Sequence, residues 1–262
     1  RNPLSRNQSA VYQICDYAVA NGLSVILNLG ISSPHENDTT EWFWEQPLAD
    51  VKANFTERWG DKFLGIYNND EPGGVQLDGD WKLWYTYFGE RLARWNHSAL
   101  NPLYQIYQKM LDAHNGTLPT DYNLEADFFV NEVLIKGDPG LQALNQADIT
   151  AFTSDYALYW FDYLGGYDVL FAEMGWNASI SQQIALIKGA ARLQDKDWGA
   201  IVTWKYQGHP FLDDNPAQIY NQMVQAYQAG AKYIVIFDYS KDKETGNTDV
   251  AMTDEHYDML QR

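Results

Sequence analysis

The strongest constraint on the fold is an alternation of short apolar runs with segments of helical periodicity. Seven runs are predicted as strands, at residues 23–30, 62–69, 126–134, 149–155, 168–175, 199–206 and 231–240. Most of them are continuously apolar, as expected of parallel strands that are buried on both faces. Strands that alternate with helices predict an α/β protein whose parallel strands are joined by helical crossovers.

The segments between the strands have the periodicity and end signals of helices. Helices are predicted at 9–20, 47–59, 138–148, 179–194, 216–229 and 253–260, and residues 156–166 form a helix or a long loop. Asn21-Gly22, Gly60 and Gly230 follow three of these helices, where a left-handed residue commonly ends a helix. The aromatic-rich stretch 80–114 is predicted as a helical insertion.

Seven parallel strands are one fewer than in a (β/α)8 (TIM) barrel. The chain opens inside or just before a helix, so we expect the first strand to lie upstream of Arg1 or to be missing from the chain. A length of 262 residues suits one barrel domain over 1–262. The alternative is an open doubly wound sheet, which is weakened because no early strand is followed by a glycine-rich phosphate loop.

Polar and aromatic residues end nearly every predicted strand. In barrels the carboxyl ends of the strands carry the chemistry. Carboxylates that face one another there suit glycoside hydrolysis, in which one acid protonates the leaving oxygen and another attacks or activates water. The strand-end residues are Asn28, Asn68, Asn69, Asp70, Glu71, Asn131, Glu132, Asp155, Glu173, Trp204, Lys205, Tyr206, Asp238 and Tyr239.

Three of these strand ends resemble those of glycoside hydrolases that have a TIM-barrel fold. The segment NNDEP at 68–72 resembles the Asn-Glu-Pro strand end that carries the acid/base. FAEMGW at 171–176 is similar to the Glu-X-Gly strand end that carries the nucleophile, and VTWKYQ at 202–207 resembles the Trp-bearing strand that follows. The resemblance implies that Glu71 is the acid/base and Glu173 the nucleophile or base.

The family places its two acids on strands four and seven, whereas here they follow predicted strands three and six if one strand lies upstream. Another arrangement is therefore open, in which Asp70 and Glu71 work with Asp155 or Glu173. Each residue also has a structural interpretation. Glu71 would cap the turn before Gly73-Gly74, and Asp155 would bond to neighbouring loops.

Amide, phenol and indole side chains near the acids would hold sugar hydroxyls and stack on pyranose faces. Trp42 and Trp44 lie in the predicted loop EWFWEQP and are expected to form a substrate platform, whereas Trp204 lines the site or packs in the core. Asp238 is equally suited to binding and to structural hydrogen bonds. The expected substrate-binding residues are Asn69, Trp204, Tyr206, Asp238, Trp42 and Trp44.

Charge and composition exclude several other functions. A net charge of −17 and a pI of about 4.5 disfavour nucleic acid and anionic lipid as partners. No apolar run approaches the roughly 20 residues needed to cross a bilayer. The five histidines show no HxH or HExxH spacing, so we expect neither zinc nor another metal, and no cofactor. Cys15, the one cysteine, is predicted to be a buried small apolar residue.

Asn-X-Ser/Thr sequons favour a secreted or cell-surface glycoprotein. Six occur, where 18 Asn and 22 Ser plus Thr in 262 residues predict about 1.5 by chance. They lie at Asn7, Asn37, Asn54, Asn96, Asn115 and Asn177. The same features suit a non-catalytic, self-assembling surface, sheath or filament protein. A Schiff-base aldolase using Lys205 is a weaker alternative.

Overall fold

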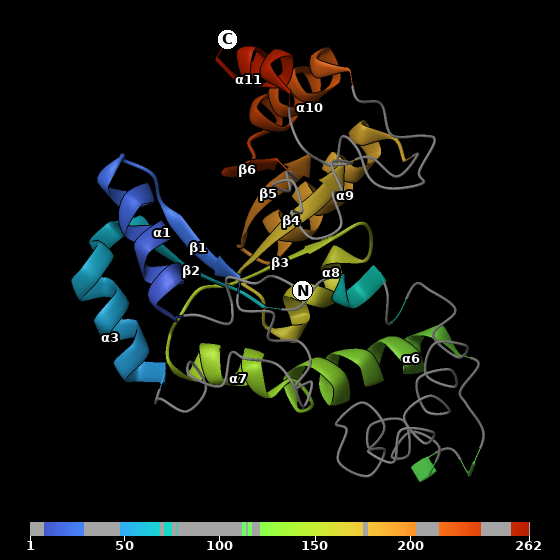
Figure 1. The fold of residues 1–262 in the computed structure, drawn as a ribbon. Helices are drawn as coiled ribbons and strands as arrows, with labels where there is room; N and C mark the ends of the chain where they lie inside the picture. The colour runs from blue at the N-terminus through green and yellow to red at the C-terminus, as the bar shows by residue number, and fades with distance from the viewer. Residues whose placement is uncertain are drawn as a thin grey trace, which may run out of the picture. The chain divides into compact units, whose positions relative to one another are not determined.

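A computed structural model of the chain shows an α/β fold with six described strands, all in parallel pairings (Figure 1). The residues that it describes are 8–28, 48–68, 71–74, 77, 112–113, 115–116, 121–174, 178–202, 215–236 and 253–261. They fall into two compact units, Arg1–Thr153 with Leu164–Asp168, and Ser154–Tyr163 with Val169–Arg262.

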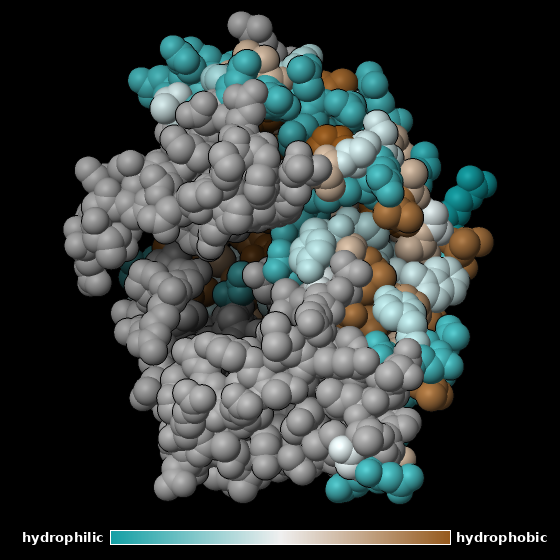
Figure 2. All heavy atoms as spheres, turned by 90° about the vertical axis from the view of Figure 1, so that its right-hand side faces the viewer, coloured by the Kyte–Doolittle hydropathy of each residue, from teal (hydrophilic) through white to brown (hydrophobic). Residues whose placement is uncertain are grey.

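The described surface mixes polar and apolar side chains. Figure 2 shows one face, on which the coloured residues include both hydrophilic and hydrophobic ones. Of the helices in the described ranges, none combines the length and the apolar character that a bilayer-spanning segment requires.

The first unit contains β1 (Val25–Asn28), β2 (Phe63–Tyr67) and the start of β3 (Ala151–Asp155). β1 pairs with β2, and β2 with β3, both in parallel. Gly65 in β2 has a φ of +146°, and a Cβ there would lie 2.3 Å from the backbone oxygen of Thr150. Only glycine allows the two backbones to approach this closely.

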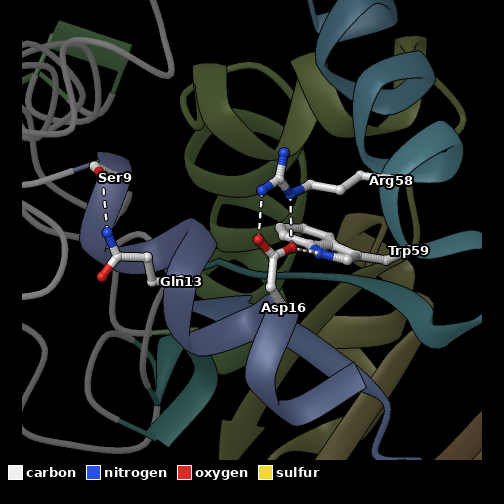
Figure 3. A network of polar contacts seen from close by, with 5 residues as sticks. All are labelled: Ser9, Gln13, Asp16, Arg58 and Trp59. Carbon is white, nitrogen blue, oxygen red and sulfur yellow. Dashed lines mark hydrogen bonds and ion pairs between the residues drawn. The ribbon is translucent and has the colours of Figure 1, made fainter. Parts of the chain in front are cut away.

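Helices α1 (Gln8–Ala20) and α3 (Leu48–Trp59) are joined by polar and aromatic contacts. The Asp16 carboxylate accepts hydrogen bonds from Arg58 Nε at 2.7 Å and from the indole Nε1 of Trp59 at 2.9 Å (Figure 3). Phe55 is buried, stacks on Trp59 at 5.0 Å and meets Tyr12 edge-on at 6.1 Å. The bonds from Arg58 and Trp59 lower the pKa of Asp16. These contacts hold α1 and α3 together, although the two helices are distant in sequence.

The strand predicted at 126–134 is wrong, because this segment is helical. α6 (Tyr122–Phe128) continues into η4 (Phe129–Ile135), a π-helix. The buried apolar residues recur at intervals of three and four, the period of a helix face; they are Ala126, Phe129, Val130, Val133 and Leu134. The aromatic and β-branched content suggested a strand, but the spacing of these residues was already helical. Glu132 therefore ends no strand and forms an ion pair with Lys136 one turn later.

After η4, α7 (Pro139–Gln146) leads into β3, as predicted. α7 begins at Asp138, whose Oδ1 accepts a hydrogen bond from the backbone N–H of Leu141 at 2.8 Å. Pro139 occupies the first position of the helix, where its missing N–H costs nothing. The predicted insertion at 80–114 lies outside the described residues apart from 112 and 113.

The second unit is built on β4 (Val169–Met174), β5 (Asp197–Val202) and β6 (Tyr233–Ile236), which pair in parallel in that order. α9 (Ile180–Leu193) packs on β4 and β5, and α10 (Pro216–Ala229) packs on β5, β6 and α11 (Asp254–Leu260). The sequence predicted α10 to the residue, because Asn215 and Gly230 mark its ends.

The order of the six strands along the sheet is their order along the chain. A doubly wound sheet shows a reversal of this order, and none occurs among the strands that the structure describes. The parallel α/β architecture is thus confirmed at the level of class, whereas a closed barrel of eight strands stays a prediction. Glu71 now follows the second described strand and Glu173 lies in the fourth, so the three-strand separation of the family's acids is not reproduced among the described strands.

Candidate active site

Glu173 lies near the carboxyl end of β4 and is held by two neighbours. Its side chain is 7% exposed, and its Oε1 accepts a hydrogen bond of 2.7 Å from the buried hydroxyl of Ser154. Gln183, from α9, donates its Nε2 to the backbone oxygen of Glu173 at 2.6 Å. The carboxyl group therefore has a fixed orientation inside the second unit.

An aromatic ring lies on the same face of the sheet as this carboxyl group. Phe171 and Glu173 are two residues apart in β4, so their side chains lie on the same face of the sheet. A Cβ on Gly199 would lie 2.7 Å from both the Phe171 ring and the backbone oxygen of Tyr233, so only glycine leaves room for this ring. Phe171 in turn meets the ring of Tyr233 edge-on at 6.2 Å. Apolar neighbours lower the local dielectric constant and so strengthen the electrostatic effect of a carboxylate.

Asp155 is the last residue of β3 and belongs to the same unit as Glu173. It is fully buried, and its Oδ1 accepts a hydrogen bond from the backbone N–H of Ala157 at 3.1 Å. This local bond turns the chain at the end of the strand. Glu173 and Asp155 are thus two buried carboxyl groups at the carboxyl ends of strands that neighbour each other in the sheet.

Tyr159 begins α8 (Tyr159–Gly165) and lies within electrostatic range of both acids. Its side chain is 2% exposed. Burial is the largest cause that raises the pKa of its phenol far above the usual value, followed by the charges of Asp155, Glu173 and Asp162. The phenol therefore keeps its proton across the range in which enzymes work and can act only as a neutral hydrogen-bonding group.

Glu71 lies in the first unit, in a strained backbone conformation. Its φ is +49°, in the left-handed region, and Pro72 follows. Residues before proline favour extended conformations, and a left-handed conformation at a residue with a Cβ costs about 1–2 kcal/mol. Its side chain is partly exposed, whereas the three residues after it are buried. Such strain occurs disproportionately at functional sites, and here it sets the direction of the Glu71 side chain.

A buried polar cluster anchors the chain just before Glu71. Asn68 is fully buried at the end of β2, and its Nδ2 donates to Asp138 Oδ2 at 3.1 Å and to the Tyr167 hydroxyl at 3.3 Å. Desolvation by burial raises the pKa of Asp138 despite the hydrogen bonds that lower it. Asp138 and Tyr167 thus fix the strand end from which the segment 69–71 leaves.

The structure brings Asp155 and Glu173 together in one unit, whereas Glu71 belongs to the other. The pairing of Glu71 with Glu173 in one active site therefore stays a prediction. The remaining predicted catalytic and binding residues lie outside the described residues: Asp70, Asn69, Trp204, Tyr206, Asp238, Trp42 and Trp44.

Six polar residues of the two clusters were missed by sequence reasoning: Ser154, Tyr159, Asp162, Gln183, Asp138 and Tyr167. Ser154 precedes the strand-end Asp155 and was overlooked because serine is common in strand and loop segments. Asp138 carried a signal, because an Asp-Pro-Gly segment typically begins a helix. Tyr159 carried none, since tyrosines are abundant in this chain and only the fold places this one beside the acids.

The described sequon asparagines, Asn54 and Asn115, are both exposed. Asn54 lies on α3, and Asn115 adopts a positive φ of 55°. The other four, Asn7, Asn37, Asn96 and Asn177, lie outside the described residues.

Within the described ranges, no group of three or more His, Cys, Asp or Glu residues is arranged to hold a metal ion. Cys15 is buried in α1, as predicted, and burial raises the pKa of its thiol. The chemistry that the described part of the site offers is therefore that of carboxyl, hydroxyl and amide groups.

Comparison with known proteins identifies no family for this chain. No protein-family model matches it, and no curated protein matches its sequence. Among solved structures, a bee venom hyaluronidase in complex with a hyaluronic acid tetramer is similar with a TM-score of 0.36 and 15% sequence identity. The match covers 72% of this chain and 66% of the hyaluronidase, just under two thirds of its length.

Proposed function

We propose that this chain is a glycoside hydrolase that works with carboxyl groups at strand ends. The observation that carries the proposal is the pair of buried carboxyl groups, Asp155 and Glu173, at neighbouring strand ends of one unit. Buried acids are costly unless they are held by hydrogen bonds, and natural proteins keep such arrangements mainly at functional sites.

The two acids have different surroundings, which suits a division of roles. Glu173 is oriented by the Ser154 hydroxyl and shares its face of the sheet with the Phe171 ring, so we assign it the nucleophile or base role. Asp155 receives a backbone N–H and is near a neutral phenol. Glu71, on its strained backbone, remains the proposed acid/base. Pairs of carboxyl groups in different environments are the basis of glycosidic cleavage.

We further propose a carbohydrate substrate, a location outside the cell or on its surface, and one barrel domain over 1–262. Support for the location comes from the six sequons and from the exposure of the two whose structure is described. A mobility shift after enzymatic removal of N-glycans from the native protein checks it.

The test is release of reducing ends from a panel of polysaccharides by the parent and by three isosteric variants, Glu173→Gln, Asp155→Asn and Glu71→Gln. Loss of a carboxyl group that acts in acid–base catalysis lowers kcat by about 10²–10⁴-fold. Glu132→Gln is the matched control, because this glutamate lies in a helix and pairs with Lys136, and its activity should equal that of the parent.

Unchanged turnover in Glu173→Gln, with circular dichroism like that of the parent, would remove Glu173 from the mechanism. Absence of any reducing-end release by the glycosylated parent would favour the non-catalytic surface, sheath or filament protein.

A further inference from the structure

Tyr159 has a buried hydroxyl group that forms no hydrogen bond with any described residue. Its side chain is 2% exposed, so bulk water does not solvate the hydroxyl. A buried phenol nearly always has a hydrogen-bond partner, because leaving it without one destabilises the fold.

The next tyrosine on the same helix face shows what a structural phenol does here. Tyr163 is also buried, and its hydroxyl donates to the backbone oxygen of Asp197 at 2.7 Å. That bond ties α8 to the start of β5. Tyr159 makes no such tie, so its hydroxyl has no role in holding the described parts of the unit together.

Three carboxyl groups lie within electrostatic range of the Tyr159 phenol. Among the charges that act on the phenol, that of Asp155 is the largest, ahead of those of Glu173 and Asp162. Glu173 Oε1 already receives the Ser154 hydroxyl. Asp155 Oδ1 receives the N–H of Ala157. A water molecule between the phenol and a carboxylate would satisfy both groups, because a buried water needs two to four polar partners.

We infer that Tyr159 is a positioning residue that holds one water molecule against the carboxylate of Asp155. The water accepts the phenol hydrogen bond and donates one to Asp155. The inference rests on the proposed function and deepens it, because a water that donates to Asp155 stabilises the ionised form of one of the two proposed acids.

The experiment is a pH titration of the side-chain carboxyl groups of the whole chain by ¹³C NMR, with Asp155→Asn identifying the Asp155 signal. Donated hydrogen bonds stabilise the ionised form, so Tyr159→Phe should raise the midpoint of Asp155 by about one pH unit. The same variant should unfold at the same urea concentration as the parent or a higher one. Tyr163→Phe, which removes an equally buried hydroxyl, should lower the unfolding midpoint and leave the Asp155 titration unchanged.

An Asp155 titration that is the same in Tyr159→Phe and in the parent would overturn the inference. A shift confined to Glu173 would overturn it too, as would an equal shift in Tyr163→Phe. The readout needs no substrate, so it separates the two proposals. If the Asp155 midpoint moves but no polysaccharide is cleaved, the water site stands and the proposed function fails.

Discussion

The hydrogen bond between Ser154 and Glu173 gives a quantitative test of the candidate site. Ser154 is 1% exposed, and its hydroxyl lies 2.7 Å from Glu173 Oε1. A hydrogen bond to a charged acceptor contributes about 1.5–3 kcal/mol to stability, and one between neutral groups about 0.5–1.5 kcal/mol. Ser154→Ala should therefore lower the free energy of unfolding by about 2 kcal/mol at neutral pH.

A double-mutant cycle measures how much of this hydrogen-bond energy depends on the charge of Glu173. In a Glu173→Gln background the acceptor is neutral, so Ser154→Ala should cost about 1 kcal/mol less than in the parent. The four proteins are compared by urea unfolding at pH 7. The control is Ser181→Ala, because Ser181 is an exposed serine of the same unit, lies in the first turn of α9 and belongs to no sequon. It should change stability by less than about 0.5 kcal/mol.

A coupling energy near zero would refute this reasoning, because Ser154 would then not be bonded to a charged Glu173. A large effect of Ser181→Ala would show instead that the unit responds to any loss of a serine hydroxyl.

Two further predictions concern the first unit. Glu71→Gly should be more stable than Glu71→Ala by about 1 kcal/mol in urea unfolding, because glycine relieves the left-handed strain at φ +49°; equal stabilities would mean that the site is unstrained. Burial raises the pKa of Asp138 in the folded state, so its contribution to stability is complete below its unfolded pKa and is lost as pH rises through the folded value. Asp138→Asn, which can still cap α7, should therefore gain stability relative to the parent as pH rises in that window, and a pH-independent difference would contradict the raised pKa.

Residues that cap helix ends were sufficient to predict the helices that they delimit. α10 was predicted with its observed bounds because Asn215, Pro216 and Gly230 each act within one turn. The segment 126–134 was predicted wrongly because its residue types suggested a strand while their spacing was helical. The residue types of a segment are weaker evidence for its secondary structure than the spacing of its buried positions, because tertiary packing selects that spacing.

The site was less predictable than the fold. Asp155 and Glu173 were found because strand ends are visible in the sequence. Ser154 and Tyr159 were not found, since their relation to the acids depends on strand register and on the turn into α8. Asn68 was noted only as a strand-end residue, and its bond to Asp138 joins positions 70 residues apart.

The contact of Asp16 with Arg58 and Trp59 has a consequence for how α1 and α3 associate. It ties α1 to α3 across 42 residues of sequence, and Tyr12 meets Phe55 edge-on between the same two helices. The entropy cost of closing a loop grows only slowly with its length, by about 0.6 kcal/mol for each doubling. The association of α1 with α3 is therefore decided by these side chains more than by the number of residues between the two helices.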